Sequence, residues 1–198
     1  MSNKELLGLM SVALTVFAYV PYFRSIFKRQ TKPHMFSWII WGIVNAVAAA
    51  GQFSRGAGPG SWAAGFTALV CIAVALLSVV SGEKRITRGD WVAFIAALAA
   101  IPLWSFTDDP LGAVILATLI NAVGCYPTLR KSYDHPYQEN VLTWSVNGVR
   151  ALISLLAIER YSPVTMIFPL AWLFTNGGIA LLLIWRRRAQ AGETPNRA

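Results

Sequence analysis

The feature that most constrains this chain is a series of long apolar runs that occupy nearly all of its 198 residues. Charged residues make up only 13% of the chain and hydrophobic residues 56%, whereas about a quarter of a soluble domain is charged. A helix that crosses a bilayer needs about 20 mostly apolar residues, and about 17 are still sufficient. The sequence therefore predicts an all-α integral membrane protein.

Seven stretches qualify as transmembrane helices, and segments rich in charge, glycine or proline separate them. The predicted helices cover residues 6–23, 35–52, 61–81, 91–106, 111–129, 141–158 and 163–185. The fourth of these is the shortest.

Basic residues are distributed unevenly between the two sides that seven spans create. Thirteen of the 17 Lys and Arg residues fall on the side of the carboxyl terminus, whereas Lys4, Arg55 and Arg160 fall on the other. Cytoplasmic loops are enriched in Lys and Arg. We therefore expect the amino terminus outside and the carboxyl terminus in the cytoplasm, in a bacterial-type inner or plasma membrane. The net charge of +8 is then explained by the basic residues of the cytoplasmic loops, and we expect no nucleic-acid partner.

Two parts of the chain match each other at a single offset of 106 residues, the separation of Pro21 and Pro127. The matched pairs are Pro21/Pro127, Arg24/Arg130, Ser37/Thr143, Trp38/Trp144 and Gly42/Gly148. Such agreement in one register indicates an internal duplication. We predict two parallel three-helix repeats, residues 1–89 and 108–198, joined by a linker helix within 90–107 (3+1+3). Transporters built from parallel repeats bind their solute at the repeat interface near mid-membrane.

This arrangement resembles the SWEET, SemiSWEET and PQ-loop membrane proteins. The resemblance rests on a proline near the cytoplasmic end of the first helix of each repeat, a basic loop after it, and Asn-Gly in the last helix. The residues that carry it are Val20-Pro21-Tyr22, Gln30-Thr31-Lys32, Ser37, Tyr126-Pro127-Thr128 and Asn176-Gly177. The resemblance implies a seven-helix transporter fold and a sugar as substrate.

Arg150 stands out because it lies midway along the predicted sixth helix. A cation at that depth costs at least about 2.5–3.5 kcal/mol on insertion scales, so it normally faces a partner or a watery cavity. Its counterpart in the first repeat is Val44. We expect a role in substrate binding or gating. A structural Arg that bonds backbone carbonyls or extends to the interface is the alternative.

Other polar residues within the predicted helices extend this candidate site. Thr143, Asn147, Arg150 and Ser154 share one helical face, and lipid offers them no hydrogen bonds. The predicted substrate-binding residues are Asn45, Asn121, Thr143, Asn147, Arg150, Asn176 and Trp41. Polar contact between helices is the alternative for each of them, and for Trp41 a place in the interfacial aromatic belt. Pro21 and Pro127 are candidate hinges, or alternatively the ends of their helices.

Several kinds of chemistry find no support in the sequence. It has no phosphate-binding Gly-x-x-x-x-Gly-Lys loop, no metal-ligand spacing and no recognisable nucleophile–base set. We expect no enzyme activity, cofactor or metal, and Cys71 and Cys125 as small buried hydrophobic residues.

The functional hypothesis is a small-solute transporter that works by alternating access, with the lipid bilayer and the solute as its partners; homo-oligomers remain open. Arg150 favours an anionic or carboxylate-bearing solute, and the family resemblance keeps a sugar as the other candidate. The competing hypothesis is a membrane receptor or scaffold that has the same fold and transports nothing.

Overall fold

The computed structural model describes residues 1–29, 33, 35–82, 88, 91–92, 94–95, 98, 110–125, 129, 132–134 and 136–193. Within these ranges the chain is all-helical and contains no strand. Most of the predicted linker helix lies outside the described residues, as do Pro127, its neighbours and residues 30–32.

The described helices follow the predicted pattern closely. They are α1 (Asn3–Phe27), α2 (Met35–Ser54), α3 (Trp62–Ser81), α5 (Pro110–Gly124), α7 (Val141–Leu156) and α8 (Pro163–Glu193), with short 3-10 helices η1 (Gly58–Ser61) and η2 (Pro136–Gln138). The largest differences from the prediction are that α5 ends earlier and α8 continues further. The extension of α8 is stabilised by Arg186 and Arg187, which donate hydrogen bonds to the backbone carbonyls of Tyr133, Pro136 and Glu139.

Local signals explain where several helices begin. Ser2 and Glu5 form a capping box at the start of α1, which satisfies two backbone donors of its first turn. The side chain of Asn140 caps α7 by accepting from Leu142 N at 2.9 Å. Pro21 lies inside α1, which continues to Phe27. The alternative that Pro21 ends its helix is therefore wrong.

Among the described residues, four helices are long and apolar enough to cross a membrane by length and composition: α1, α2, α3 together with η1, and α8. Helices α5 and α7 are apolar but shorter. Large hydrophobic side chains are exposed along α1, α3 and α8, including Leu9, Phe17, Leu69, Leu76, Phe174 and Leu181. A soluble protein rarely exposes contiguous apolar surface of this kind, so the structure is compatible with an integral membrane protein.

We describe the helices as two groups in chain order, which we call the two triplets: α1–α3, and α5, α7 and α8. In the first triplet α3 packs against both α1 and α2; in the second, α8 packs against both α5 and α7. Between the triplets α1 packs on α7 and α2 packs on α5. An apolar cluster lies where α2, α3, α5 and α8 meet, and it includes Val44, Val47, Ala113, Val114 and Phe168.

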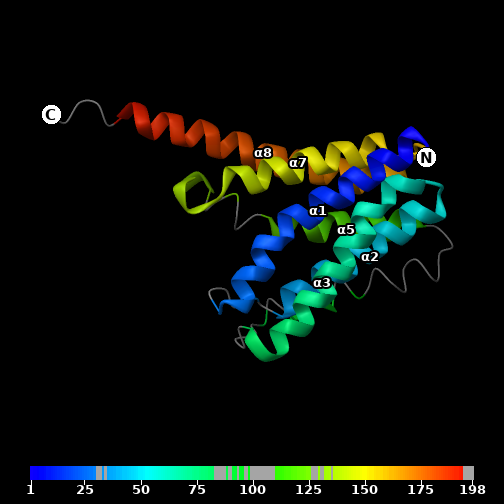
Figure 1. Cartoon of the computed structure of the whole chain (residues 1–198), viewed down its shortest axis with the longest axis horizontal. Coiled ribbons are helices and arrows are strands. Elements are labelled where there is room, and N and C mark those ends of the chain that lie inside the picture. The colour runs from blue at the N-terminus through cyan, green and yellow to red at the C-terminus, as the bar shows by residue number, and fades with distance from the viewer. Residues whose placement is uncertain are drawn as a thin grey trace.

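The backbones of the two triplets meet at the end of the bundle where α1 begins. There, backbone hydrogen bonds join residues 56–57 to residues 159–160. Toward the other end, α1 and α3 turn away from α7 and α8, and Figure 1 shows the two groups spreading apart. The burial of α7 changes accordingly: Arg150, Ala151, Ser154, Ala157 and Ile158 are buried, whereas residues 141–147 include no buried side chain.

Candidate functional site

Arg150 lies in the middle of α7 and is only 5% exposed. Its Nη1 donates to Thr67 Oγ1 at 2.8 Å and to Thr15 Oγ1 at 3.2 Å. Thr15 belongs to α1 and Thr67 to α3, so this one side chain joins the second triplet to the first. Its guanidinium carbon lies 4.8 Å from the centre of the Trp172 ring, within the range of a cation–π interaction.

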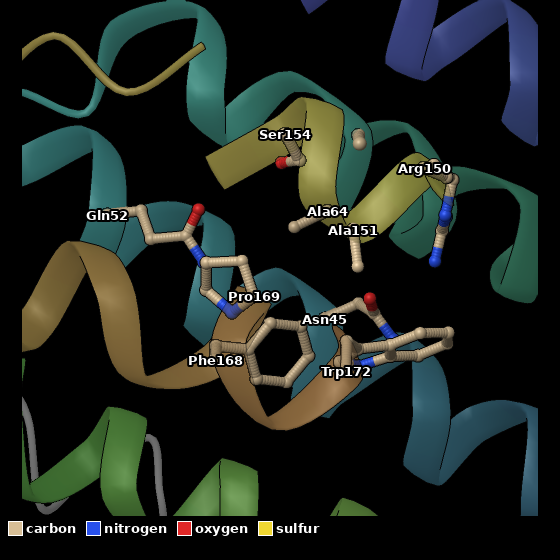
Figure 2. A pocket seen from close by; sticks show the side chains of 10 residues that line it. Asn45, Gln52, Ala64, Arg150, Ala151, Ser154, Phe168, Pro169 and Trp172 are labelled. Carbon is tan, nitrogen blue, oxygen red and sulfur yellow. The ribbon is translucent and has the colours of Figure 1, made fainter. Parts of the chain in front are cut away.

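A small cavity lies beside this guanidinium, between α2, α3, α7 and α8 (Figure 2). It is lined by Asn45, Gln52, Ala63, Ala64, Arg150, Ala151, Ser154, Phe168, Pro169 and Trp172, and we call it the Arg150 cavity. Its volume of about 20 Å³, counted for the centre of a water-sized sphere, has room for about one water molecule. A larger solute enters only if the helices around the cavity move apart.

Polar atoms around the cavity lack partners to an unusual degree. Both side-chain amide atoms of Gln52, the Nε of Arg150 and the Nε1 of Trp172 are buried without a hydrogen bond. An unpaired buried polar group costs about 1–3 kcal/mol, and native proteins leave few such groups. Three of them on one cavity indicate a site that a polar ligand or water completes.

Nothing within the described ranges neutralises Arg150 by an ion pair. Its hydrogen bonds end on hydroxyl oxygens, and no cluster of His, Cys, Asp or Glu that could hold a metal occurs in the described part of the chain. A buried cation without an anionic partner is costly. The site therefore has the electrostatics of an anion-binding site, and its residues form no nucleophile–base pair.

The cavity is closed at one end by a close contact between the triplets, which we call the glycine seam (residues 56–60 against 154–160). Glu159 N donates to Ala57 O and Arg160 N donates to Gly56 O, each at 3.1 Å, and Ser154 Oγ donates to Gly60 O at 2.7 Å. Such close approach requires glycine. A Cβ atom at Gly60 would lie only 2.9–3.0 Å from backbone atoms of Ile158.

The structure brings some of the predicted site residues together and separates others. Asn45 and Arg150 line the cavity. Asn176 is buried one turn beyond Trp172, with its Oδ1 unpaired and its Nδ2 bonded to Trp172 O at 2.8 Å. The remaining predicted residues lie away from the cavity lining: Asn121 is buried, Asn147 is half-buried, Thr143 is exposed and Trp41 is 38% exposed against the Trp38 ring.

Among the residues that contact Arg150 or line the cavity but are absent from the predicted set are Thr15, Thr67, Gln52 and Trp172. Gln52 carried the clearest signal, because a glutamine within an apolar run must find partners inside the protein. A single Thr or Trp in an apolar helix is too common to stand out, since Thr can bond its own backbone and Trp favours interfaces.

No protein-family model, curated protein or solved structure significantly matches this chain.

Proposed function

We propose that this protein is an integral membrane transporter of a small solute that works by alternating access between two three-helix repeats. The repeats would be α1–α3 and α5, α7 and α8, joined by a linker helix in the 3+1+3 order of SWEET-like and PQ-loop proteins. We further propose that the amino terminus faces outside and the carboxyl terminus the cytoplasm.

Support for the duplication comes from the packing of equivalent helices. At the offset of 106 residues, α1 corresponds to α5, α2 to α7 and α3 to α8. The contact of α1 with α7 then corresponds to the contact of α5 with α2, as a two-fold axis between the repeats requires. Buried positions also correspond: Val44, Ala48 and Gly51 on α2 are matched by the buried residues Arg150 and Ser154 on α7 and Ala157 directly after it.

The observation that carries the transport proposal is the position of the Arg150 cavity. It lies between the two triplets, beside a buried cation that has no anionic partner within the described residues, and the glycine seam closes it at one end. Alternating access requires a central site whose two ends close in turn. The spread of the helices at the other end (Figure 1) is the arrangement expected of a state that opens toward the cytoplasm.

The test uses the full chain reconstituted in lipid vesicles. Uptake of labelled glucose, a short carboxylate and an amino acid is compared with protein-free vesicles. A second protein carries Ala57→Cys and Glu159→Cys across the glycine seam, with Cys71 and Cys125 replaced by alanine. We expect flux of at least one solute, arrest of that flux when the new pair is cross-linked, and recovery on reduction.

Flux that continues with the seam cross-linked would contradict alternating access at this seam. Tight binding of a solute without flux would favour the receptor or scaffold hypothesis instead. The cross-linked protein must retain its thermal unfolding temperature for either conclusion to hold.

A further inference from the structure

We infer that the ligand of the Arg150 cavity is a short monocarboxylate with a hydroxyl or amide group at its other end. This inference rests on the proposed function for its physiological meaning, but it concerns binding and can be tested without transport. It selects among the solutes that the sequence leaves open, and it selects against a sugar.

The carboxylate end is defined by Arg150 and Trp172. Nη1 of Arg150 is already bonded to the two threonines, while Nε is buried and unpaired. Within the described residues Nη2 also has no hydrogen bond, which leaves the Nε–Nη2 edge of the guanidinium free. That edge matches the two oxygens of a carboxylate. The unpaired Nε1 of Trp172 adds a third donor, and neither side chain can accept a hydrogen bond.

The second polar group is defined by Gln52, which is 1% exposed and unpaired at both amide atoms. Its side chain offers one acceptor and one donor group. A hydroxyl or an amide satisfies both, because each of these groups donates and accepts. A purely apolar tail would leave the glutamine unpaired, at a cost of about 1–3 kcal/mol.

The part of the cavity between these two ends is mostly apolar, and its two polar side chains, Asn45 and Ser154, already donate to the backbone oxygens of Trp41 and Gly60. In the view of Figure 2, Gln52 and Arg150 lie at opposite sides of the cavity, with the methyl groups of Ala64 and Ala151 and the ring of Phe168 between them. A methylene chain suits such walls, whereas a sugar would place hydroxyl groups against methyl groups without partners. The occupant is therefore polar at both ends and apolar in the middle, and it binds when the surrounding helices have moved apart, because the cavity of about 20 Å³ holds about one water molecule.

The first experiment measures binding to the purified full chain in detergent by isothermal titration calorimetry. The probes are 4-hydroxybutanoate, butanoate, 4-hydroxybutanamide and glucose. We expect 4-hydroxybutanoate to bind most tightly, butanoate more weakly, and the neutral amide and glucose weakest. Equal or tighter binding of glucose or the neutral amide would overturn the inference, and so would the absence of carboxylate binding at millimolar concentration.

Two variants test the carboxylate end and the second polar end of the ligand separately. Arg150→Gln should raise the Kd of both carboxylates roughly tenfold or more. Gln52→Leu should remove the preference for 4-hydroxybutanoate over butanoate. Gly65→Ala is the matched control, because a Cβ there meets only Ala49 Cβ, at 3.8 Å. The inference would be overturned if Arg150→Gln bound both carboxylates as tightly as the wild type does. It would also be overturned if Gln52→Leu kept the preference for 4-hydroxybutanoate over butanoate.

The failure of this inference is distinguishable from the failure of the transport proposal. Carboxylate binding without vesicle flux supports the ligand class and contradicts transport. Glucose flux without carboxylate binding supports transport and contradicts the ligand class.

Discussion

The two interfaces between the helix triplets occupy corresponding positions in the sequence but differ in chemistry. Where α2 meets α5, the contact is apolar: Val44, Val47 and Ala48 pack in one cluster with Ala113 and Val114. Where α1 meets α7, a buried arginine bonds Thr15 of α1 and also reaches Thr67 of the neighbouring α3. Val44 and Arg150 are counterparts at the offset of 106 residues, so one substitution accounts for much of the contrast.

If the fold is duplicated as we propose, the comparison teaches that equivalent surfaces can take different roles. The apolar interface is densely packed, since a Cβ at Gly51 would lie 2.6 Å from Val114 Cγ2. Such a contact resists sliding and suits a pivot. The polar interface leaves donors unpaired and borders the cavity, so we propose that ligand binding alters the stability of this interface.

Placing a charge in the apolar interface should have the largest effect, which is on the yield of folded protein. In Val44→Arg the guanidinium enters a site with 0% exposure and apolar neighbours, at a cost of at least about 2.5–3.5 kcal/mol. We expect little folded protein in membranes, measured by fluorescence-detected size-exclusion chromatography. Val80→Arg is the control, because Val80 is 86% exposed near the end of α3. Normal yield and melting of Val44→Arg would contradict the pivot interpretation.

Removing the charge from the polar interface should abolish function while sparing stability. In Arg150→Met the side chain keeps similar length and removes a buried charge that has no ionic partner. Replacing buried charged groups by apolar ones is often neutral or stabilising by about 1–4 kcal/mol. We therefore expect loss of ligand binding with an unchanged or higher unfolding temperature, measured by calorimetry and thermal unfolding. A markedly lower unfolding temperature would indicate that Arg150 is a structural residue instead.

Opening the glycine seam should have an intermediate effect, which is on the accessibility of residue 57. In Gly60→Ala the new methyl group would lie 2.5 Å from Ile158 Cγ1 and 2.9–3.0 Å from backbone atoms that cannot rotate away, at a cost of about 1–3 kcal/mol. We expect Ala57→Cys to react faster with a membrane-impermeant thiol reagent when Gly60→Ala is present. Gly65→Ala should leave the rate unchanged. Equal rates in both variants would show that the seam does not depend on Gly60.

Removing the hydroxyl groups that accept from Arg150 should have the smallest effect, which is on carboxylate binding. Thr67→Val and Thr15→Val remove the hydroxyl oxygens that accept from Nη1 at 2.8 and 3.2 Å. We expect each variant to weaken carboxylate binding a few-fold, which corresponds to about 0.5–1.5 kcal/mol for a lost hydrogen bond. The loss should be larger in Thr67→Val, because its hydrogen bond is the shorter one. Thr118→Val is the control, because its hydroxyl bonds only the backbone of its own helix. A larger effect in the control would contradict the assigned support.

Much of the helical structure was predictable because its signals are local. Apolar runs of bilayer length, the Ser2 cap and the Asn140 cap act within one segment, so reading along the chain recovers them. The length of α8 was predicted less well. Its last turns are held by Arg186 and Arg187 through carbonyl groups of residues 133–139, a contact between segments about 50 residues apart that no local pattern reports.

The sequence by itself determined the described helices, because apolar runs of bilayer length are local signals, but not which of their faces are buried: Thr143 shares one predicted face with Arg150 and is nevertheless exposed. It also indicated Arg150 as the residue to explain, because a charge in an apolar run is costly anywhere. Only the tertiary structure decided what surrounds that charge. Thr15, Thr67, Gln52 and Trp172 lie on four different helices, and their meeting depends on how those helices rotate and cross.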